Sequence, residues 1–401
     1  MKGQAEALRE VYVVDYLRTP FSRSRPSEPE RDVYNSMRMD QALALLIKKI
    51  IERDAVNPDE IGDVITGCSF QVGENWLYGG RHPVLLAGLP VTVPAVAMER
   101  ACASSMNAVA LGAMEIMTGN SEVVLAGGME HMTHVPMSNN PCMTPNMRLL
   151  ASLEYARYQM GAGYVMGLTA EKLAEKSGIT REEMDLFAAG SHAKASRSLD
   201  EGWFREELME MKVEAGGEVK VIDADQSIRR ETSMEQLRKL QPAFKDGGIV
   251  TAGNSAPLNA GASTILLMSG DKVKECGLKP LARILSFGWA GVDPSVMGEG
   301  PVPASRKALA NGGLSAHEVG LWEVNEAFAV VVLYAIRELR LDPSRVNVHG
   351  GAIAIGHPLG ATGARVVGTL ARQLKQTGKE YGMATLCVGG GQGFSTLLQR
   401  A

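Results

Sequence analysis

Two stretches of the chain, CASSMNAVALGAMEIMTG (Cys102–Gly119) and HPLGATGARVVGTLARQLKQTG (His357–Gly378), share a pattern from which the fold can be inferred. Each begins with a reactive side chain, continues in a helical pattern and ends in Thr-Gly. Each is followed by a short apolar strand that ends in glycines, EVVLAGG from Glu122 and MATLCVGGG from Met383. Cys102 and His357 therefore occupy matching positions in two halves of an internal repeat.

The repeat extends upstream of both stretches. Each half offers a strand, a helix and a second strand: Val11–Leu17, Asp40–Arg53 and Ile61–Gly67 in the first, and Leu281–Gly288, Pro303–Asn311 and Val319–Ala327 in the second. Strands that alternate with helices predict mostly parallel sheets covered by helices. We therefore predict an α/β fold class with duplicated halves in a five-layer α-β-α-β-α sandwich.

The chain divides into three predicted regions. The N-terminal half covers residues 1–131 and is completed by about 258–278, and the C-terminal half covers residues 279–401. Residues 132–257 are richer in Met, charge and helix signals, and they begin with an irregular, proline-containing stretch, which predicts an inserted loop domain. The charged helix expected at Arg181–Lys194 predicts a solvated face.

Composition limits the class of protein. The 401 residues carry a net charge of −4, with 45% hydrophobic and 21% charged residues, which is typical of a soluble globular protein and unlike a nucleic-acid binder. The five scattered cysteines predict neither a disulfide framework nor a zinc site. The N-terminal MKGQAEALRE lacks an apolar signal core, and no apolar run is long enough to span a membrane. A reducing, cytoplasmic location is the expectation.

The two repeat starts carry candidate catalytic groups. RACASS (Arg100–Ser105) places Cys102 between a short strand and a helix, where backbone N–H groups and the helix dipole stabilise a thiolate. The alternative is a buried, inert cysteine. GGAIAIGHPLGATG (Gly350–Gly363) flanks His357 with glycines, a turn that can direct an imidazole into a cleft. Its alternative is a structural turn with a capping histidine.

Two further motifs follow strands in the second half. NEAFA (Asn325–Ala329) offers an amide that can hold a water or a carbonyl oxygen, with a helix N-cap as the alternative. CVGGGQG (Cys387–Gly393) does not have the spacing of a dinucleotide-binding fingerprint. Its glycines would let backbone N–H groups reach a substrate oxygen, and Cys387 could transfer a proton or be a core cysteine.

Together these motifs resemble the thiolase family, and within it the degradative 3-ketoacyl-CoA thiolases of bacterial fatty-acid β-oxidation. The resemblance covers nearly the whole chain and includes four further strings: GGMEHMTHVPM from Gly127, MGLTAEKLA from Met166, PAFKDGGIVTAGN from Pro242 and DPSVMGEGPVPAS from Asp293. It implies thiolytic cleavage of a 3-ketoacyl-CoA to acetyl-CoA and a shortened acyl-CoA, reversible as a Claisen condensation.

The resemblance also implies residue roles. His357 activates Cys102, which carries the acyl group, and Cys387 protonates the departing acetyl-CoA. One oxyanion hole would use His357 and a water held by Asn325, and the other the backbone N–H groups of Cys102 and Gly389. No metal or redox cofactor is implied, because CoA is a substrate and its thioester stabilises the carbanion.

Substrate contacts are carried over at four positions. Arg229 aligns near the CoA phosphates, Met166 near the pantetheine and Phe328 with the acyl pocket, while Ser255 neighbours Ala256, where the family usually has serine. Gln241 replaces a usual arginine. Val165 stands where acetoacetyl-CoA thiolases usually carry histidine, which favours a longer-chain enzyme over that alternative.

Two other functions compete with this interpretation. A ketoacyl-synthase-like condensing enzyme would use a cysteine with two histidines, whereas this chain has Asn325 in place of the first and adds Cys387. An inactive thiolase-like subunit is disfavoured by the intact set of four residues. The expected partners are CoA and acyl-CoA thioesters, a second copy in a homodimer or homotetramer, and a hydratase–dehydrogenase subunit. The GGMEHMTHVPM segment could serve an interface or the core.

Overall fold

A computed structural model describes residues 8–215 and 217–401, so most of the N-terminal segment MKGQAEALRE lies outside the described residues. The first half contains β1 (Val11–Arg18), α1 (Met39–Arg53), β2 (Ile61–Gly67), α2 (Arg81–Leu86), β3 (Ala95–Met98), α3 (Ser104–Met117), β4 (Val123–His131), β7 (Ala260–Ser269) and α9 (Gly270–Glu275). The second half contains β8 (Ala282–Gly291), α10 (Pro301–Gly312), β9 (Leu321–Val324), α11 (Ala329–Leu339), α12 (Ala352–Ile355), α13 (Leu359–Thr377), β10 (Tyr381–Val388) and β11 (Gln392–Arg400).

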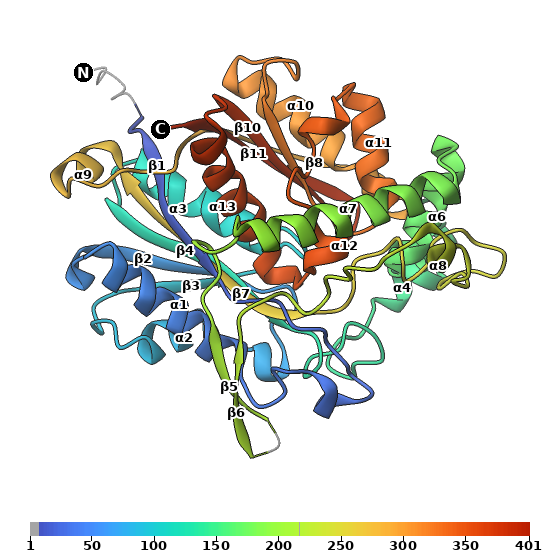
Figure 1. Ribbon diagram of the computed structural model, residues 1–401, viewed down its shortest axis with the longest axis horizontal. Helices are drawn as coiled ribbons and strands as arrows, with labels where there is room; N and C mark the ends of the chain where they lie inside the picture. The colour runs from blue at the N-terminus through green and yellow to red at the C-terminus, as the bar shows by residue number, and fades with distance from the viewer. Residues whose placement is uncertain (1–7, 216) are drawn as a thin grey trace.

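Between β4 and β7 the chain forms the predicted insertion, in the order α4 (Met147–Ala151), α5 (Met160–Gly163), α6 (Met166–Ser177), α7 (Arg181–Glu201), β5 (Met211–Ala215), β6 (Glu218–Ile222) and α8 (Met234–Arg238). Short 3-10 turns join several elements, among them η3 (Gly73–Asn75) and η5 (Pro294–Glu299). Figure 1 shows β5 and β6 as a separate hairpin that extends away from the central sheet. The exact boundaries of the three predicted regions stay predictions.

The central sheet has nine strands in the order β3-β2-β4-β7-β1-β8-β11-β10-β9. The expectation of mostly parallel sheets is wrong, because only β2–β3, β2–β4 and β9–β10 pair in parallel. After the insertion, β7 returns between β4 and β1 and runs antiparallel to both. Gly390 and Gly391, both at φ 80°, close a tight turn that makes β10 and β11 an antiparallel hairpin.

Helices α3 and α13 form the middle layer of the molecule. They pack against each other and against strands of both halves, while α1 covers the outer face of the first half and α10 that of the second (Figure 1). Every residue from Leu359 to Leu374 of α13 is buried, as expected for a helix with protein on all sides. The strands of the first half and those of the second half form the two β layers, one on each side of α3 and α13. The predicted α/β class with duplicated halves in five layers is confirmed.

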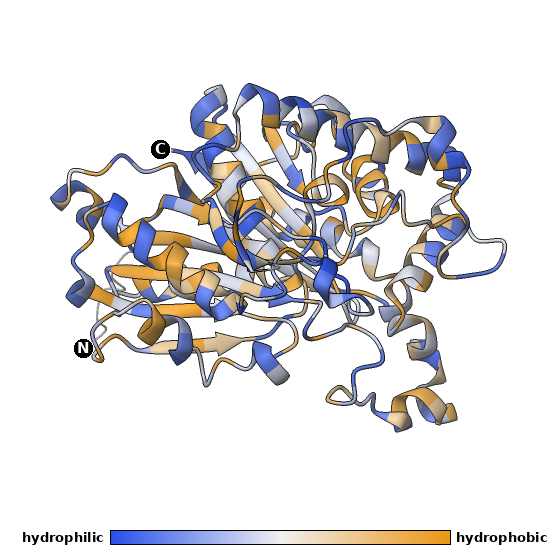
Figure 2. Cartoon of the chain, turned by 60° about the horizontal axis from the view of Figure 1, so that its bottom comes forward, coloured by the Kyte–Doolittle hydropathy of each residue, from blue (hydrophilic) through white to orange (hydrophobic). Residues whose placement is uncertain are grey.

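Close packing of the two middle helices depends on small residues. A Cβ atom on Gly363 would lie 2.1 Å from the backbone nitrogen of Met106, and the Ser105 hydroxyl accepts a hydrogen bond from the backbone N–H of Ala364 at 2.8 Å. Figure 2 shows hydrophobic residues concentrated in the strands and hydrophilic residues toward the outer loops and helix ends. The core therefore surrounds the two helices that carry the repeat.

One surface prediction needs correction. Helix α7 is not a fully solvated element, because Met184, Ala188, Ser191 and Ala195 are among its buried residues. These residues face α11 and α12, against which α7 packs. Exposed charged residues such as Glu182, Arg197 and Asp200 lie on the other face, whereas Asp185 is buried and bonds Arg181 and Asn254. The helix therefore has one solvated face and one buried face.

Candidate active site

Cys102 lies in a tight connection between β3 and α3, two residues before the helix begins. Ala101 adopts φ 42°, a left-handed conformation that is uncommon for a residue with a side chain and that reverses the chain direction before the cysteine. Cys102 keeps partial contact with solvent, unlike the buried residues that follow it. The predicted position at a strand-to-helix turn is confirmed.

His357 lies in the corresponding place, two residues before α13 begins. Gly356 precedes it at φ 119°, a conformation that strongly favours glycine. The Asn259 side chain accepts a hydrogen bond from the His357 backbone N–H at 2.7 Å. The repeat in sequence is therefore also a repeat in local structure.

The starts of the two helices converge on the ends of β2 and β4. A Cβ atom on Gly67 would lie 2.3 Å from the carbonyl carbon of Ser104 at the start of α3. A Cβ atom on Gly128 would lie 2.1 Å from the carbonyl oxygen of Gly360 and 2.8 Å from Cβ of Ser105. These glycines let both helix starts meet at one end of the sheet, so the turns that carry Cys102 and His357 converge there.

Asn325 and Cys387 complete the set from the adjacent strands β9 and β10. The Asn325 side-chain amide lies 3.4 Å from Nε2 of His357, and its Oδ1 is buried without a protein hydrogen-bond partner. The N-cap alternative for Asn325 is wrong, since α11 begins only at Ala329 and Phe328 precedes it as the cap. The charge of Cys102 acts on buried Cys387, which places the two sulfurs in one site.

The site holds Cys102 as a thiol in its resting state. Burial raises the pKa of Cys102 to about 11, although the backbone N–H groups of Gly389 and of Cys102 itself lower it. The expected stabilisation of a thiolate at the helix start is therefore present, but burial outweighs it. Burial, followed by the charge of Cys102, raises the pKa of Cys387 well above its usual range.

The imidazole of His357 is held neutral in one tautomer. Burial, with a smaller contribution from the Arg365 charge, lowers the pKa of His357 to about 3. Thr362 donates its hydroxyl hydrogen to the Pro358 carbonyl at 2.8 Å, so its oxygen accepts from Nδ1–H of His357 at 2.7 Å. Nε2 is left as the basic nitrogen that can take a proton.

Glu326 of the NEAFA motif supports the site from behind. Its buried carboxylate accepts hydrogen bonds from the Ser191 hydroxyl at 2.6 Å, the Asn347 amide at 2.8 Å and the Ile353 backbone at 3.1 Å. Asn347 also bonds both the N–H and the carbonyl of Val324, the last residue of β9. Sequence reasoning missed Asn347, Asn259 and Thr362; only Thr362 stood inside a quoted motif.

The four predicted substrate residues lie in different surroundings. Met166 begins α6, and its sulfur lies 3.8 Å from where a Cβ on Gly389 would be, so it borders the site. Phe328 and Met166 pack in one apolar cluster with Cys387. The Ser255 hydroxyl donates a hydrogen bond to the Thr251 carbonyl at 2.7 Å. Arg229 is exposed on the insertion.

Basic side chains gather near Arg229. Burial lowers the pKa of Arg23, and the nearby charges of Arg25, Arg229 and Arg31 lower it further. Like charges held this close at a protein surface create a positive potential that attracts an anionic ligand. Val165, by contrast, is 41% exposed at the N-cap of α6.

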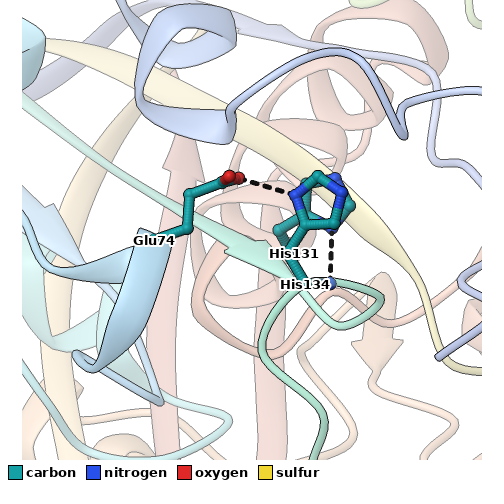
Figure 3. Close-up of side chains that lie close together, drawn as sticks. All are labelled: Glu74, His131 and His134. Carbon is teal, nitrogen blue, oxygen red and sulfur yellow. Dashed lines mark hydrogen bonds and ion pairs between the residues drawn. The ribbon is translucent and has the colours of Figure 1, made fainter.

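Within the described residues, Glu74, His131 and His134 are one group of three side chains of types that bind metals (Figure 3). The His131 and His134 rings stack with centroids 3.8 Å apart and 10° between their planes, so their in-plane lone pairs do not converge. His131 bonds the Tyr34 carbonyl and the His134 backbone, and His134 lies 2.9 Å from the Glu74 carboxylate. Each ring nitrogen of the two histidines therefore already has a hydrogen-bond partner within the protein.

Comparisons with known proteins agree with this geometry. Residues 11–271 match the model of the thiolase N-terminal domain, and residues 278–400 match that of the thiolase C-terminal domain. A curated relative, the 3-ketoacyl-CoA thiolase of Saccharophagus degradans, is 44% identical over 398 residues, covering 98% of both chains.

Solved structures of similar proteins give the same result. The human mitochondrial 3-ketoacyl-CoA thiolase superposes with a TM-score of 0.88 at 36% identity over 98% of this chain and 100% of that chain, and its complex with CoA with 0.87 over 98% and 99%. The Bacillus anthracis acetyl-CoA acetyltransferase superposes with 0.86 at 35% identity over 99% and 100%. With its duplicated fold, paired helix starts and whole-length matches, the chain belongs to the thiolase family.

Proposed function

We propose that this protein is a 3-ketoacyl-CoA thiolase that transfers the acyl group through Cys102. The observation that carries the proposal is the meeting of Cys102 and His357 at matching helix starts, with Asn325 and Cys387 beside them. Membership of the thiolase family makes the chain an acyltransferase, and the curated relative that covers its whole length is a 3-ketoacyl-CoA thiolase.

The first half-reaction begins with proton transfer. Nε2 of His357 takes the Cys102 proton as the sulfur attacks the keto carbon of the substrate, because neutral imidazole is the available base and the resting cysteine is a thiol. The bond between the keto carbon and the neighbouring methylene carbon then breaks, and the methylene carbon takes a proton from Cys387. Acetyl-CoA leaves, and the acyl group stays on Cys102.

The second half-reaction returns the enzyme to its starting state. The thiol of a second CoA gives its proton to the Cys387 thiolate and attacks the acyl-enzyme, and Cys102 leaves as the thiolate and recovers its proton from His357. Backbone N–H groups of Gly389 and Cys102 already point at the sulfur region, which supports their role as one oxyanion hole. Asn325, with Nδ2 near His357 and an unpartnered Oδ1, fits the second.

Substrate positions follow from charge and polarity. The cluster of arginines around Arg229 suits the phosphates of CoA, and a human relative has been solved with CoA bound. Met166 and Phe328, in one apolar cluster with Cys387, suit the pantetheine and the acyl chain. Ser255 can still accept a hydrogen bond from the substrate. No cofactor is required, because each step uses thiols, an imidazole and a thioester.

Chain length separates the leading candidate from an acetoacetyl-CoA thiolase. The fold cannot separate them, since the structures of both kinds of enzyme superpose almost equally well. The curated relative and Val165, in place of a histidine, favour longer 3-ketoacyl-CoA substrates. The test is kcat/KM across 3-ketoacyl-CoA substrates of four to sixteen carbons, where activity limited to four carbons would favour the alternative.

Assembly and location remain predictions. No helix among the described residues is long and apolar enough to cross a membrane. We propose a cytoplasmic homodimer or homotetramer, with a hydratase–dehydrogenase subunit as a further partner. Mass photometry of the purified protein, alone and with a candidate hydratase–dehydrogenase, distinguishes these assemblies.

A further inference from the structure

Glu130 is a fully buried carboxylate near the end of β4 that the reaction described above does not use. Uncharged donors hold it: the backbone N–H groups of Ser69 at 2.8 Å, Phe70 at 3.2 Å and Gly360 at 2.9 Å, the Asn75 amide at 2.8 Å and the Cys68 thiol at 3.6 Å. Burying a carboxylate is costly, so this set of donors marks a specific requirement for an acceptor here.

The bond to Gly360 connects Glu130 to the catalytic histidine. Gly360 is the second residue of α13 and lies three residues after His357. A Cβ atom on Gly360 would be 2.3 Å from the Met129 carbonyl oxygen and 2.8 Å from Cα of Cys68, so the helix start is pressed against β4 and the segment after β2. Glu130 therefore joins the start of α13, from the second half, to the first half.

The negative charge of Glu130 also acts on Cys102, the proposed nucleophile. It contributes to the raised pKa of Cys102, after burial and the two backbone hydrogen bonds. A carboxylate at the start of a helix interacts favourably with the helix dipole, and it stabilises a cation that forms nearby. During acyl transfer the cation would be the His357 imidazolium, which lies three residues before the Gly360 N–H that bonds Glu130, and which the Arg365 charge opposes.

We propose that Glu130 is a positioning residue: its carboxylate fixes the start of α13, and its negative charge favours the imidazolium that His357 becomes on taking the Cys102 proton. The proposal rests on the acyl-transfer function proposed above. No bond to Glu130 changes in the reaction, and its contribution depends on its being ionised. A merely structural role would require the hydrogen bonds but not the charge.

The dependence on charge makes pH the deciding variable. Burial raises the pKa of Glu130 to about 7, although the hydrogen bonds from Ser69, Phe70 and Gly360 lower it. At pH 5.5 the wild-type side chain is therefore mostly neutral, as glutamine is, whereas at pH 8.5 it is anionic. The quantity to compare is kcat of the wild-type protein divided by kcat of Glu130→Gln. This ratio should be close to its minimum at pH 5.5 and about tenfold larger at pH 8.5, and the substitution should change KM less than kcat.

Matched variants separate charge from structure. Glu171 is another buried carboxylate held by backbone N–H groups, those of Ile249 and Val250, and Glu171→Gln should show a ratio that does not vary with pH. Glu130→Asp retains the charge and should recover part of the activity at pH 8.5. A folded Glu130→Gln protein whose deficit is the same at every pH would overturn the proposal.

Two further measurements keep the proposal testable. If Glu130→Gln does not fold, Asn75→Ala can be used instead, because it removes one hydrogen-bond donor to Glu130. The acid limb of the kcat–pH profile of Asn75→Ala should lie at higher pH than that of the wild-type protein. An acid limb at the same pH would contradict the proposal. If the wild-type protein turns over no 3-ketoacyl-CoA, the proposed function fails separately. Alkylation of Cys102 by iodoacetamide then still reports on Glu130, since its midpoint should fall to lower pH in Glu130→Gln, and an unchanged midpoint counts against the proposal.

Discussion

At Cys102 two opposing effects act on one sulfur atom. Backbone N–H groups at the helix start favour the thiolate, as the sequence indicates, but burial favours the thiol and is the larger effect. His357 is neutral for the same reason. Burial therefore favours a thiol at Cys102 and a neutral imidazole at His357.

This protonation state predicts how Cys102 reacts with pH. Because the pKa of Cys102 is about 11, the thiolate fraction and the rate of iodoacetamide alkylation should rise roughly tenfold per pH unit from pH 7 toward pH 10. Peptide mapping at each pH assigns the label to Cys102. A rate that is already constant at neutral pH would indicate a resting thiolate–imidazolium pair instead.

Replacing Cys102 and replacing Cys387 should impair different steps of the reaction. Cys102→Ala should abolish the acyl-enzyme, because it removes the sulfur that we propose carries the acyl group. Cys387→Ala should still form the acyl-enzyme but should slow exchange of the acetyl-CoA methyl protons by a factor on the order of 100 or more. Labelled acyl-CoA with mass spectrometry, and proton exchange by NMR, measure the two steps. Acyl transfer to the Cys102→Ala protein would contradict the assignment.

Thr362 selects the tautomer of His357. Thr362→Val should leave Nδ1–H buried without an acceptor, which costs about 1–3 kcal/mol, or roughly fivefold to 150-fold in kcat if the transition state bears the whole cost. Thr362→Ser keeps the hydroxyl and is the matched control. Equal activity of the valine and serine variants would show that this hydrogen bond does not orient the imidazole.

At the scale of elements, the contact between α3 and α13 decides the geometry of the site. Cys102 and His357, the candidate catalytic residues, each lie two positions before the first residue of a helix, so a shift between the helices would move the two apart. Gly363 makes this close approach possible, because a side chain there would overlap the backbone of Met106 in α3. The small residues of these helices are therefore structural requirements of the site.

Gly363→Ala tests this contact. Its Cβ would overlap the Met106 backbone, so the variant should lose about 3 kcal/mol of stability or more, and its activity should fall as the helices move apart. Gly190→Ala is the control: nothing lies within 4 Å of its Cβ on α7, so the variant should gain about 0.5–1 kcal/mol. Thermal denaturation compares the two, and a neutral Gly363→Ala would argue against close helix packing.

At the scale of the whole molecule, the sequence was most informative where it repeats. The paired strings around Cys102 and His357 predicted the duplicated halves and the two middle helices. Similar sequence patterns at matching positions of the two halves predict similar local structures. Strand direction was predicted less well. Local pattern does not encode whether a strand returns beside its neighbour in parallel or antiparallel, and β7 reaches its place only after a long insertion.

The candidate catalytic residues could be identified from the chain alone, because a cysteine and a histidine at matching turns, an asparagine after a strand and a glycine-flanked cysteine can be read directly from it. Their protonation states and the residues that support them follow only from the packed structure. Burial, which depends on every layer packed around the site, makes Cys102 a thiol and His357 neutral. Glu130 and Asn259 bond residues of the other half, so their positions emerge only when the two halves meet. Asn347 bonds Val324 within the second half, across a separation of 23 residues that a local pattern does not reveal.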